Sequence, residues 1–126
     1  MQSEYEEILY RYKNPNNFGR IENPDAHFKD SNPLCGDEVE VFLRIENNTI
    51  EDMKFIGAGC SISKASTDIL ADYLIGKEVE EVLEISNNEV LNLININISP
   101  MRLKCALLGL VTVKKSIEEW KNDTNN

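Results

Sequence analysis

Four residues of this chain stand out for the chemistry they could support: Cys35, Asp37, Cys60 and Cys105. Cys35 and Asp37 lie two residues apart in a turn that begins at Pro33 and contains Gly36. Proline fixes one backbone angle and glycine frees another, so this turn is expected to be tight and well defined. If the chain runs extended through Gly36, the thiol and the carboxylate point toward a common centre.

Together the four side chains offer three sulfur atoms and one carboxylate. Such a set suits zinc in a tetrahedral site, or iron with an incomplete set of thiolates. A carboxylate in place of a fourth thiolate makes the site more labile, which is useful where the metal must leave again. The alternative is that the cysteines are small buried hydrophobic residues, a common role of free cysteine. The spacing alone leaves both interpretations open, because the chain contains no CxxC pair.

Cys60 is expected at a bend between a strand and a helix. The sequence Gly57-Ala58-Gly59 allows the backbone to turn sharply, and a helix capped by Ser61 or Ser63 is predicted to run to about Leu74. Backbone N–H groups and the dipole at a helix N-terminus favour an anion, so this position favours a thiolate.

Cys105 is expected near the start of the last helix. Ser99 is a suitable N-cap, Pro100 suits the first helical position, and the apolar pattern continues through Trp120. The three cysteines and Asp37 therefore come from a turn, a bend and a helix start, which are rigid places from which side chains can be aimed at one point.

The remaining pattern indicates both helices and strands. A helix is predicted from Ser3 to Tyr12, with a capping box of Ser3 and Glu6 and a stripe of Tyr5, Ile8, Leu9 and Tyr12. Residues 39–46 and 49–56 alternate as two strands joined by a turn at Asn47-Asn48. Short helices are predicted at 79–83 and 90–94. The stretch from Gly19 to Asn32 shows no clear period and is interpreted as an irregular surface segment.

Size and charge exclude some classes of function. A chain of 126 residues suits one domain, here 1–126 with an N-terminal helix in 1–12 and a polar tail at 122–126. A net charge of −9 argues against nucleic-acid binding and allows docking onto a basic patch of a protein. No apolar run reaches the length of a membrane span, and residues 1–11 are too charged for a signal peptide, so we expect a cytoplasmic protein with reduced cysteines.

Three segments of the chain resemble the signature segments of the IscU/SufU/NifU N-terminal family of iron–sulfur cluster scaffolds: residues 32–37 (NPLCGD), 57–66 (GAGCSISKAS) and 102–106 (RLKCA). Residues 10–19 (YRYKNPNNFG) also resemble the N-terminal region of the family, and the similarity runs from about Tyr5 to Trp120. The resemblance implies an α+β fold, in which a small three-stranded antiparallel sheet packs against several helices, with a long C-terminal helix.

The resemblance also implies a function. A cysteine desulfurase would be the partner that delivers sulfur as persulfide, and apo-proteins would receive the cluster. By motif match, Cys35, Cys60 and Cys105 correspond to the essential cysteines of the family and Asp37 to its carboxylate. Loss of that carboxylate is expected to make a bound cluster less labile. Two chains could also share one cluster as a homodimer, and we expect neither nucleic acid nor membrane as a partner.

The chain combines features of two branches of the family. Many IscU members have a histidine before the third cysteine, whereas this chain has Lys104, as SufU-like members do. SufU proteins carry an insertion between the second and third cysteines, but the span from Cys60 to Cys105 is short, as in IscU. The segment that a chaperone binds in IscU is 99–104 (SPMRLK) here.

Cationic and imidazole side chains could assist the site. Lys104 beside Cys105 would favour a thiolate or persulfide or pair with Asp37, and Arg102 is a weaker candidate for the same role. The alternative for Lys104 is a solvated lysine at a helix start. His27, the single histidine, would be a ligand only if its segment folded over the site, so exposure in a loop is the simpler expectation.

The leading hypothesis is a scaffold, not an enzyme, that assembles a transient 2Fe–2S cluster and passes it on. Its ligands would be Cys35, Asp37, Cys60 and Cys105. Cys35 and Cys105 are the candidate persulfide acceptors, with Cys35 preferred for its access. The alternative is a zinc-dependent sulfurtransferase of the SufU type, and a weaker one is a purely structural zinc module.

Overall fold

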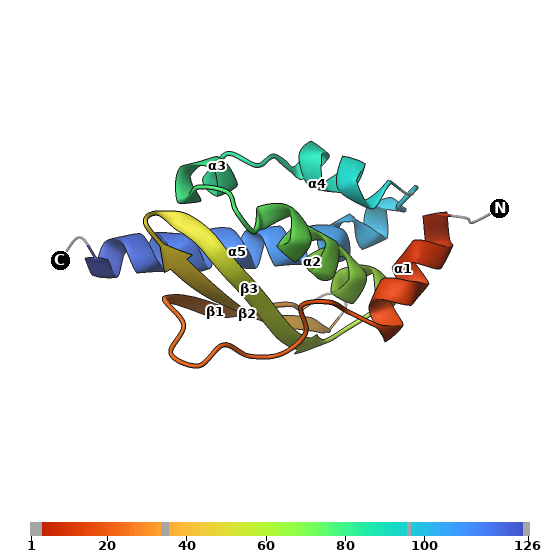
Figure 1. Ribbon diagram of the computed structural model, residues 1–126. Coiled ribbons are helices and arrows are strands. Elements are labelled where there is room, and N and C mark those ends of the chain that lie inside the picture. Colours follow the sequence, from red (N-terminus) through yellow and green to blue (C-terminus); the bar gives the residue numbers. More distant parts are fainter. Residues whose placement is uncertain (1–3, 34–35, 96, 125–126) are drawn as a thin grey trace.

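The computed structural model describes residues 4–33, 36–95 and 97–124, and these form a three-stranded antiparallel sheet with helices packed against it (Figure 1). The strands are β1 (Ala26–Asn32), β2 (Asp37–Glu46) and β3 (Thr49–Ala58), in the order β1-β2-β3. The helices are α1 (Glu4–Lys13), α2 (Ser61–Leu74), α3 (Val79–Leu83), α4 (Asn87–Ile94) and α5 (Leu103–Thr124), and a 3₁₀ turn, η1 (Pro100–Arg102), precedes α5. The fold is therefore α+β, as the resemblance implied.

The hairpin of β2 and β3 follows the alternation of the sequence. Val39, Val41 and Leu43 are buried on one face of β2, where they meet the helices. Asn47 and Asn48 both adopt positive φ, at 52° and 62°, which the tight turn between Glu46 and Thr49 requires. The prediction of two strands and an Asn-Asn turn is confirmed, and β3 extends two residues beyond its predicted end.

The interpretation of residues 19–32 as irregular is wrong for its second half, because Ala26–Asn32 forms β1. β1 pairs with β2 along its whole length, from Ala26 opposite Leu43 to Asn32 opposite Asp37. The strand lies at the edge of the sheet and its exposed side chains are polar, so it lacks the apolar alternation that marks a buried strand. This pairing helps to position a candidate ligand, because Asn32, at the end of β1, lies opposite Asp37.

Helices α2 and α5 cover one face of the sheet and supply most of the helical core (Figure 1). Fully buried residues of α2 include Ala65, Leu70 and Leu74, and those of α5 include Val113 and Ile117. The last helix was predicted to run from Pro100 through Trp120. Its first three residues instead form η1, and α5 continues to Thr124, so the predicted polar tail is partly helical.

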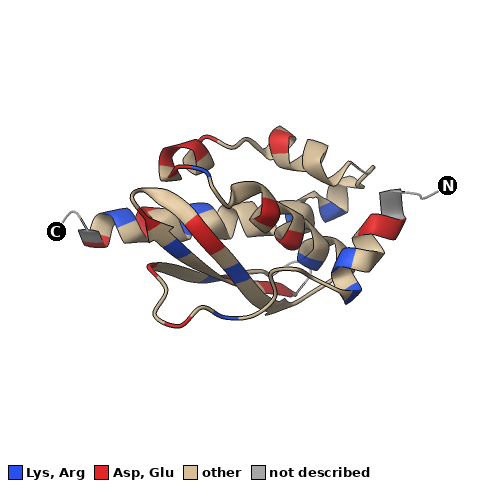
Figure 2. Ribbon diagram, viewed as in Figure 1, with Lys and Arg blue, Asp and Glu red and all other residues tan. Residues whose placement is uncertain are grey.

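The two short helices connect α2 to α5. α3 matches its predicted range, and α4 begins three residues before its predicted start because Ser86 caps it through a hydrogen bond from the Glu89 N–H. Acidic residues gather on α3, as Figure 2 shows. Glu78, Glu80, Glu81 and Glu84 are exposed there, which agrees with a solvated helix face.

Helix α1 does not bury the predicted stripe. Ile8 is 2% exposed, but Leu9 is 50% exposed and Tyr12 is 37% exposed. Ser3, the predicted cap, lies outside the described residues. α1 is held instead by polar contacts. Its Arg11 guanidinium donates to the carboxylates of Asp68, at 2.9 Å, and Asp72, at 2.5 Å.

Asp68 anchors the N-terminal segment to α2. Its side chain is fully buried and accepts hydrogen bonds from the backbone N–H groups of Asn16, at 3.1 Å, and Asn17, at 2.8 Å, as well as from Arg11. A buried carboxylate that receives this many donors is fully compensated. The segment around residues 14–18 is thereby fixed beside α2.

None of the helices among the described residues is long and apolar enough to cross a lipid bilayer.

The variant Asp68→Asn should lower the free energy of unfolding by about 3 kcal/mol, because an amide cannot accept from every donor that faces the buried carboxylate. Denaturation in urea measures this change. As a control, Asp72→Asn alters a side chain that is 39% exposed and also contacts Arg11, and it should change stability by less than about 1 kcal/mol. Equal effects of the two substitutions would contradict the anchor.

Candidate metal centre

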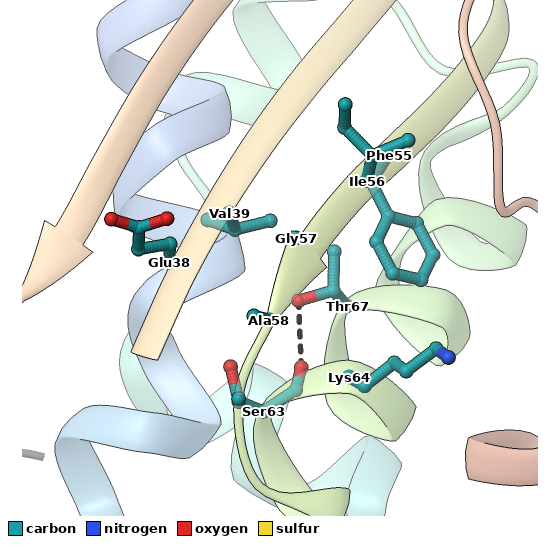
Figure 3. Close-up of a pocket in the computed structure, with 10 residues that line it drawn as sticks. Glu38, Val39, Phe55, Ile56, Gly57, Ala58, Ser63, Lys64 and Thr67 are labelled. Atoms are coloured by element: carbon teal, nitrogen blue, oxygen red, sulfur yellow. Dashed lines mark hydrogen bonds between the residues drawn. The ribbon is translucent and has the colours of Figure 1, made fainter. Parts of the chain in front are cut away.

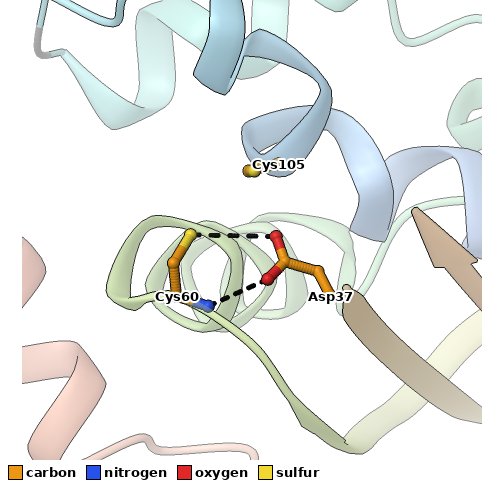
Figure 4. Close-up of side chains that lie close together, drawn as sticks. All are labelled: Asp37, Cys60 and Cys105. Atoms are coloured by element: carbon orange, nitrogen blue, oxygen red, sulfur yellow. Dashed lines mark hydrogen bonds between the residues drawn. The ribbon is translucent and has the colours of Figure 1, made fainter. Parts of the chain in front are cut away.

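Asp37, Cys60 and Cys105 come from separate elements and meet at one end of the sheet. Asp37 is the first residue of β2, Cys60 lies between β3 and α2, and Cys105 lies in the first turn of α5. One oxygen of Asp37 and the two sulfurs all lie within 4.8 Å of one another (Figure 4). The structure thus brings together three of the four candidate ligands. The fourth, Cys35, lies outside the described residues.

The Asp37 carboxylate is held by Cys60. Its Oδ1 accepts the backbone N–H of Cys60 at 3.0 Å, and its Oδ2 lies 3.8 Å from Cys60 Sγ (dashed in Figure 4). The predicted caps Ser61 and Ser63 are wrong, because Cys60 itself is the N-cap residue of α2 and its side chain makes no capping bond. A carboxylate from the sheet therefore pairs with the backbone at the start of this helix.

Two glycines make that approach possible. A Cβ atom on Gly59 would lie 2.7 Å from Asp37 Oδ1, and a Cβ atom on Gly57 would lie 2.2 Å from the backbone oxygen of Glu38. Real Cβ contacts are never this short, so any larger residue would push β2 away from the bend. The Gly-Ala-Gly sequence is thus required for close contact as well as for bending.

Cys105 is placed by a close contact between α5 and α2. Gly109 follows Cys105 by four residues, about one helical turn, so both lie on the same face of α5. A Cβ atom on Gly109 would lie 2.7 Å from the Thr67 hydroxyl oxygen of α2. That hydroxyl donates to the Ser63 carbonyl at 2.8 Å and so is turned back along its own helix. The small residue on α5 lets the two helices approach closely, and this brings Cys105 to Cys60.

The three side chains differ in burial. Asp37 is 2% exposed and Cys105 is 3% exposed, whereas Cys60 is partly exposed. Two thiols and a carboxylate are a mixed set of soft and hard donors, which fits zinc or the iron of a cluster. An additional donor would be needed to complete a tetrahedral shell.

A small cavity lies beside the same bend but does not suit a ligand. It is lined by residues of β2, β3 and α2, among them Val39, Phe55 and Thr67 (Figure 3). Its volume of about 10 Å³ is enough for at most a single water molecule. The candidate site is therefore the cluster of sulfur and oxygen atoms and not this cavity.

The whole sequence can be compared with known proteins. Residues 3–126 match the family model described as the NifU-like N terminal domain. The chain belongs to this family.

Relatives of this NifU-like chain come from both branches. It is 29% identical to the iron–sulfur cluster assembly scaffold protein IscU of Thermotoga maritima, over 91% of this chain and 93% of the relative. It is 30% identical to the zinc-dependent sulfurtransferase SufU of Bacillus subtilis, over 87% of this chain and 86% of the relative. The crystal structure of FiSufU from Fervidobacterium islandicum superposes with a TM-score of 0.76 and 31% identity, covering 89% of this chain and 94% of that one.

The auxiliary candidates of this NifU-like domain lie near the centre but are exposed. Lys104 precedes Cys105 and its side chain reaches solvent, as does that of Arg102 in η1. Neither makes an ion pair with a residue that the structure describes, so the pairing of Lys104 with Asp37 is not observed there.

His27 lies elsewhere on the sheet. It is exposed on β1, stacks on the Phe42 ring with centroids 5.0 Å apart, and contacts the Glu40 carboxylate at 2.5 Å. It is not part of the group formed by Asp37 and the cysteines. The expectation of an exposed histidine holds, but it lies on a strand and not in a loop.

The predictions from sequence patterns do not include Gly109 and Thr67, two residues that position the site; they include Gly59 as part of the bend but not its contact with Asp37. A glycine inside the apolar pattern of a predicted helix is a signal of close packing, and Gly109 carries that signal. No pattern in the sequence says which residue of which helix it faces.

The variant Gly59→Ala should weaken the equilibrium binding of a single Co²⁺ ion about tenfold, because the new methyl group displaces the Asp37 carboxylate, and loss of such an orienting contact has this size of effect. Titration with Co²⁺, followed through the thiolate-to-metal absorption band, measures the affinity. The matched control Ala58→Gly changes the neighbouring position without adding an atom and should bind as the parent protein does. Unchanged affinity in Gly59→Ala would show that Asp37 is not positioned in this way.

Proposed function

We propose that this protein is a scaffold on which a 2Fe–2S cluster is assembled and from which it passes to apo-proteins. The observation that carries the proposal is the meeting of Asp37, Cys60 and Cys105 within 4.8 Å, in a family whose members include named cluster scaffolds. Cys35, two residues before Asp37 in the chain, would complete the donor set. The cluster is the cargo of this protein, and iron and sulfur are its substrates.

Sulfur would arrive as the persulfide of a cysteine desulfurase in the cytoplasm, where thiols are kept reduced. A thiolate of the scaffold attacks the outer sulfur, the sulfur–sulfur bond of the donor breaks, and the donor cysteine leaves as a thiolate. Cys105 is 3% exposed, which supports Cys35 over Cys105 as the first acceptor. Cys60, at the N-terminus of α2, is partly exposed.

Asp37 would make the bound cluster releasable. Its Oδ1 accepts the Cys60 N–H and its Oδ2 lies 3.8 Å from Cys60 Sγ, so Oδ2 would be the oxygen that binds iron. A single carboxylate oxygen is a weaker ligand for cluster iron than a thiolate. Release can therefore begin at the Asp37 bond while the carboxylate stays anchored to the helix.

The second candidate is a zinc-dependent sulfurtransferase. It is favoured by Lys104, exposed beside Cys105, and by similarity to the zinc-dependent sulfurtransferase SufU of Bacillus subtilis. Metal analysis of protein isolated without oxygen distinguishes the two functions. Iron and sulfide with visible absorption support the scaffold, whereas stoichiometric zinc, with desulfurase stimulation that depends on it, supports the transferase.

Anaerobic reconstitution with ferrous iron, cysteine, a cysteine desulfurase and a thiol reductant, which supplies the electrons that convert persulfide sulfur to sulfide, should load a 2Fe–2S cluster on the parent protein. Each of the variants Cys35→Ala, Cys60→Ala and Cys105→Ala should lose most of this loading, because each removes one thiolate from the shell. Visible absorption and iron-to-sulfide ratios measure the occupancy. Full occupancy in any of the three variants would remove that cysteine from the proposal.

The variant Asp37→Ala should retain its cluster longer, with transfer to an apo-ferredoxin slowed by about tenfold. It should also destabilise the fold by about 1 kcal/mol, because the Cys60 N–H loses its acceptor. Transfer is followed by circular dichroism of the recipient and stability by denaturation. The exposed neighbour Glu38 gives the control Glu38→Ala, which should transfer at the parent rate. Equal or faster transfer from Asp37→Ala would contradict the assigned role.

A further inference from the structure

The outer edges of β3 and β1 differ in whether their backbone groups are hydrogen-bonded to other segments. The outer edge of β3 is covered by backbone hydrogen bonds. Gly19 N donates to Phe55 O at 2.8 Å, and Ile50 N donates to Lys77 O at 2.8 Å. Within the described part of the chain, no backbone segment pairs with the outer edge of β1 over residues 26–31. An unpaired edge offers N–H and C=O groups to an added strand.

The groups on that edge can be identified. The Ser31 N–H donates to the side chain of Asp30 at 2.8 Å, so it does not point across to β2. In an antiparallel pair, alternate residues bond to the partner strand. The backbone groups of His27, Lys29 and Ser31 therefore face outward, and all three residues are exposed.

A groove lies between residues 30–33, at the end of this edge, and α5. Its volume is about 360 Å³, and the residues that line it include Asn32, Pro33, Lys104, Leu107, Val111 and Lys115. Leu107 and Val111 give it an apolar floor, and Val111 is 41% exposed. At one end lies Pro33, two residues before Cys35 in the chain.

Cationic side chains stand at the two ends of the floor. Lys115 pairs with Asp30 at 2.9 Å. Burial alone would raise the pKa of Asp30, but hydrogen bonds from Lys115 and the Ser31 N–H lower it below its ordinary value, so this carboxylate stays charged. Lys104 makes no ion pair with the described residues and leaves the groove with a net positive end.

Charge is distributed unevenly over the molecule. The chain carries a net charge of −9, and Figure 2 shows acidic residues clustered on α3 while basic residues are spaced along α5. A negatively charged segment is therefore attracted to the groove more than to the acidic face at α3.

We propose that the outer edge of β1 and the groove beside it bind an extended acidic peptide segment of a partner protein by strand addition. Main-chain bonds go to His27, Lys29 and the Ser31 carbonyl, since the Ser31 N–H already donates to Asp30. Apolar side chains rest on Leu107 and Val111. Acidic side chains pair with Lys104 and, alongside Asp30, with Lys115.

The geometry sets the spacing of the acidic residues. Lys104 and Lys115 are eleven residues apart on α5, a rise of about 16 Å. An extended peptide covers about 16 Å in five residues. The bound segment therefore has acidic residues about five positions apart with apolar residues between them.

Such a segment would hold its protein beside Pro33, two residues before Cys35 in the chain. That this placement serves sulfur or cluster exchange rests on the proposed function. Binding of the peptide itself does not.

Nuclear magnetic resonance tests the proposal with a short peptide in which valine and threonine alternate between two terminal glutamates. Addition of the peptide should shift the backbone amide signals of His27, Lys29 and Ser31 and slow their hydrogen exchange. Two control peptides, one with lysine at both ends and one methylated at alternate amide nitrogens, should bind at least about tenfold more weakly, since each loses the equivalent of one strong hydrogen bond or more.

Variants locate the site. Val111→Glu and Lys29→Pro should each weaken binding by about tenfold or more, the first by blocking the floor and the second by removing an outward N–H. The control Ile75→Glu alters an apolar residue of similar exposure, 38%, outside the groove, and should bind as the parent does. A spectrum of each free variant that matches the spectrum of the parent protein establishes that the variant is folded.

Three results would overturn the proposal: no amide shifts on β1, equal binding of the methylated peptide, or pairing of β1 with a second copy of this chain in place of the peptide. Cluster loading of Val111→Glu should equal that of the parent protein. Loss of peptide binding with normal loading separates a failure of this proposal from a failure of the scaffold function.

Discussion

The bond between the Asp37 carboxylate and the Cys60 N–H is the interaction on which the centre depends. It joins the first residue of β2 to the first turn of α2, 23 residues later in the chain. Without it, the start of α2 would have a backbone donor with no acceptor, and the carboxylate would be buried with one fewer partner. The same contact aims the other carboxylate oxygen at the sulfur. One hydrogen bond therefore both completes the start of the helix and sets the geometry of the candidate ligands.

A second constraint acts between the helices. Gly109 lets α5 approach Thr67 of α2, and the buried apolar residues of both helices hold this distance. Gly59 thus allows the contact between the bend and Asp37, and Gly109 allows the contact between α5 and α2. Because protein interiors are densely packed, an atom added at either contact would displace the neighbouring candidate ligands.

Sequence patterns predict the elements with local signals and miss those that depend on distant partners. The alternation from Val39 and the pair Asn47-Asn48 mark the hairpin, and the apolar spacing marks α2. β1 has few apolar residues and owes its strand form to pairing with β2, so only the family resemblance implied a third strand. Ser61 is a good cap by type, yet the acceptor at this helix start is Asp37, which no local rule connects to it. Residue types indicated the ligand set and the resemblance supported it, and three of its members meet in the structure.

The unequal exposure of the two described thiols gives the centre a direction. Cys60 reaches solvent, whereas Cys105 lies beneath it with almost no accessible surface. Under the proposed function, of these two thiols Cys60 would meet incoming metal or sulfur before Cys105. A competing oxidant or alkylating agent is likewise expected to modify Cys60 long before Cys105.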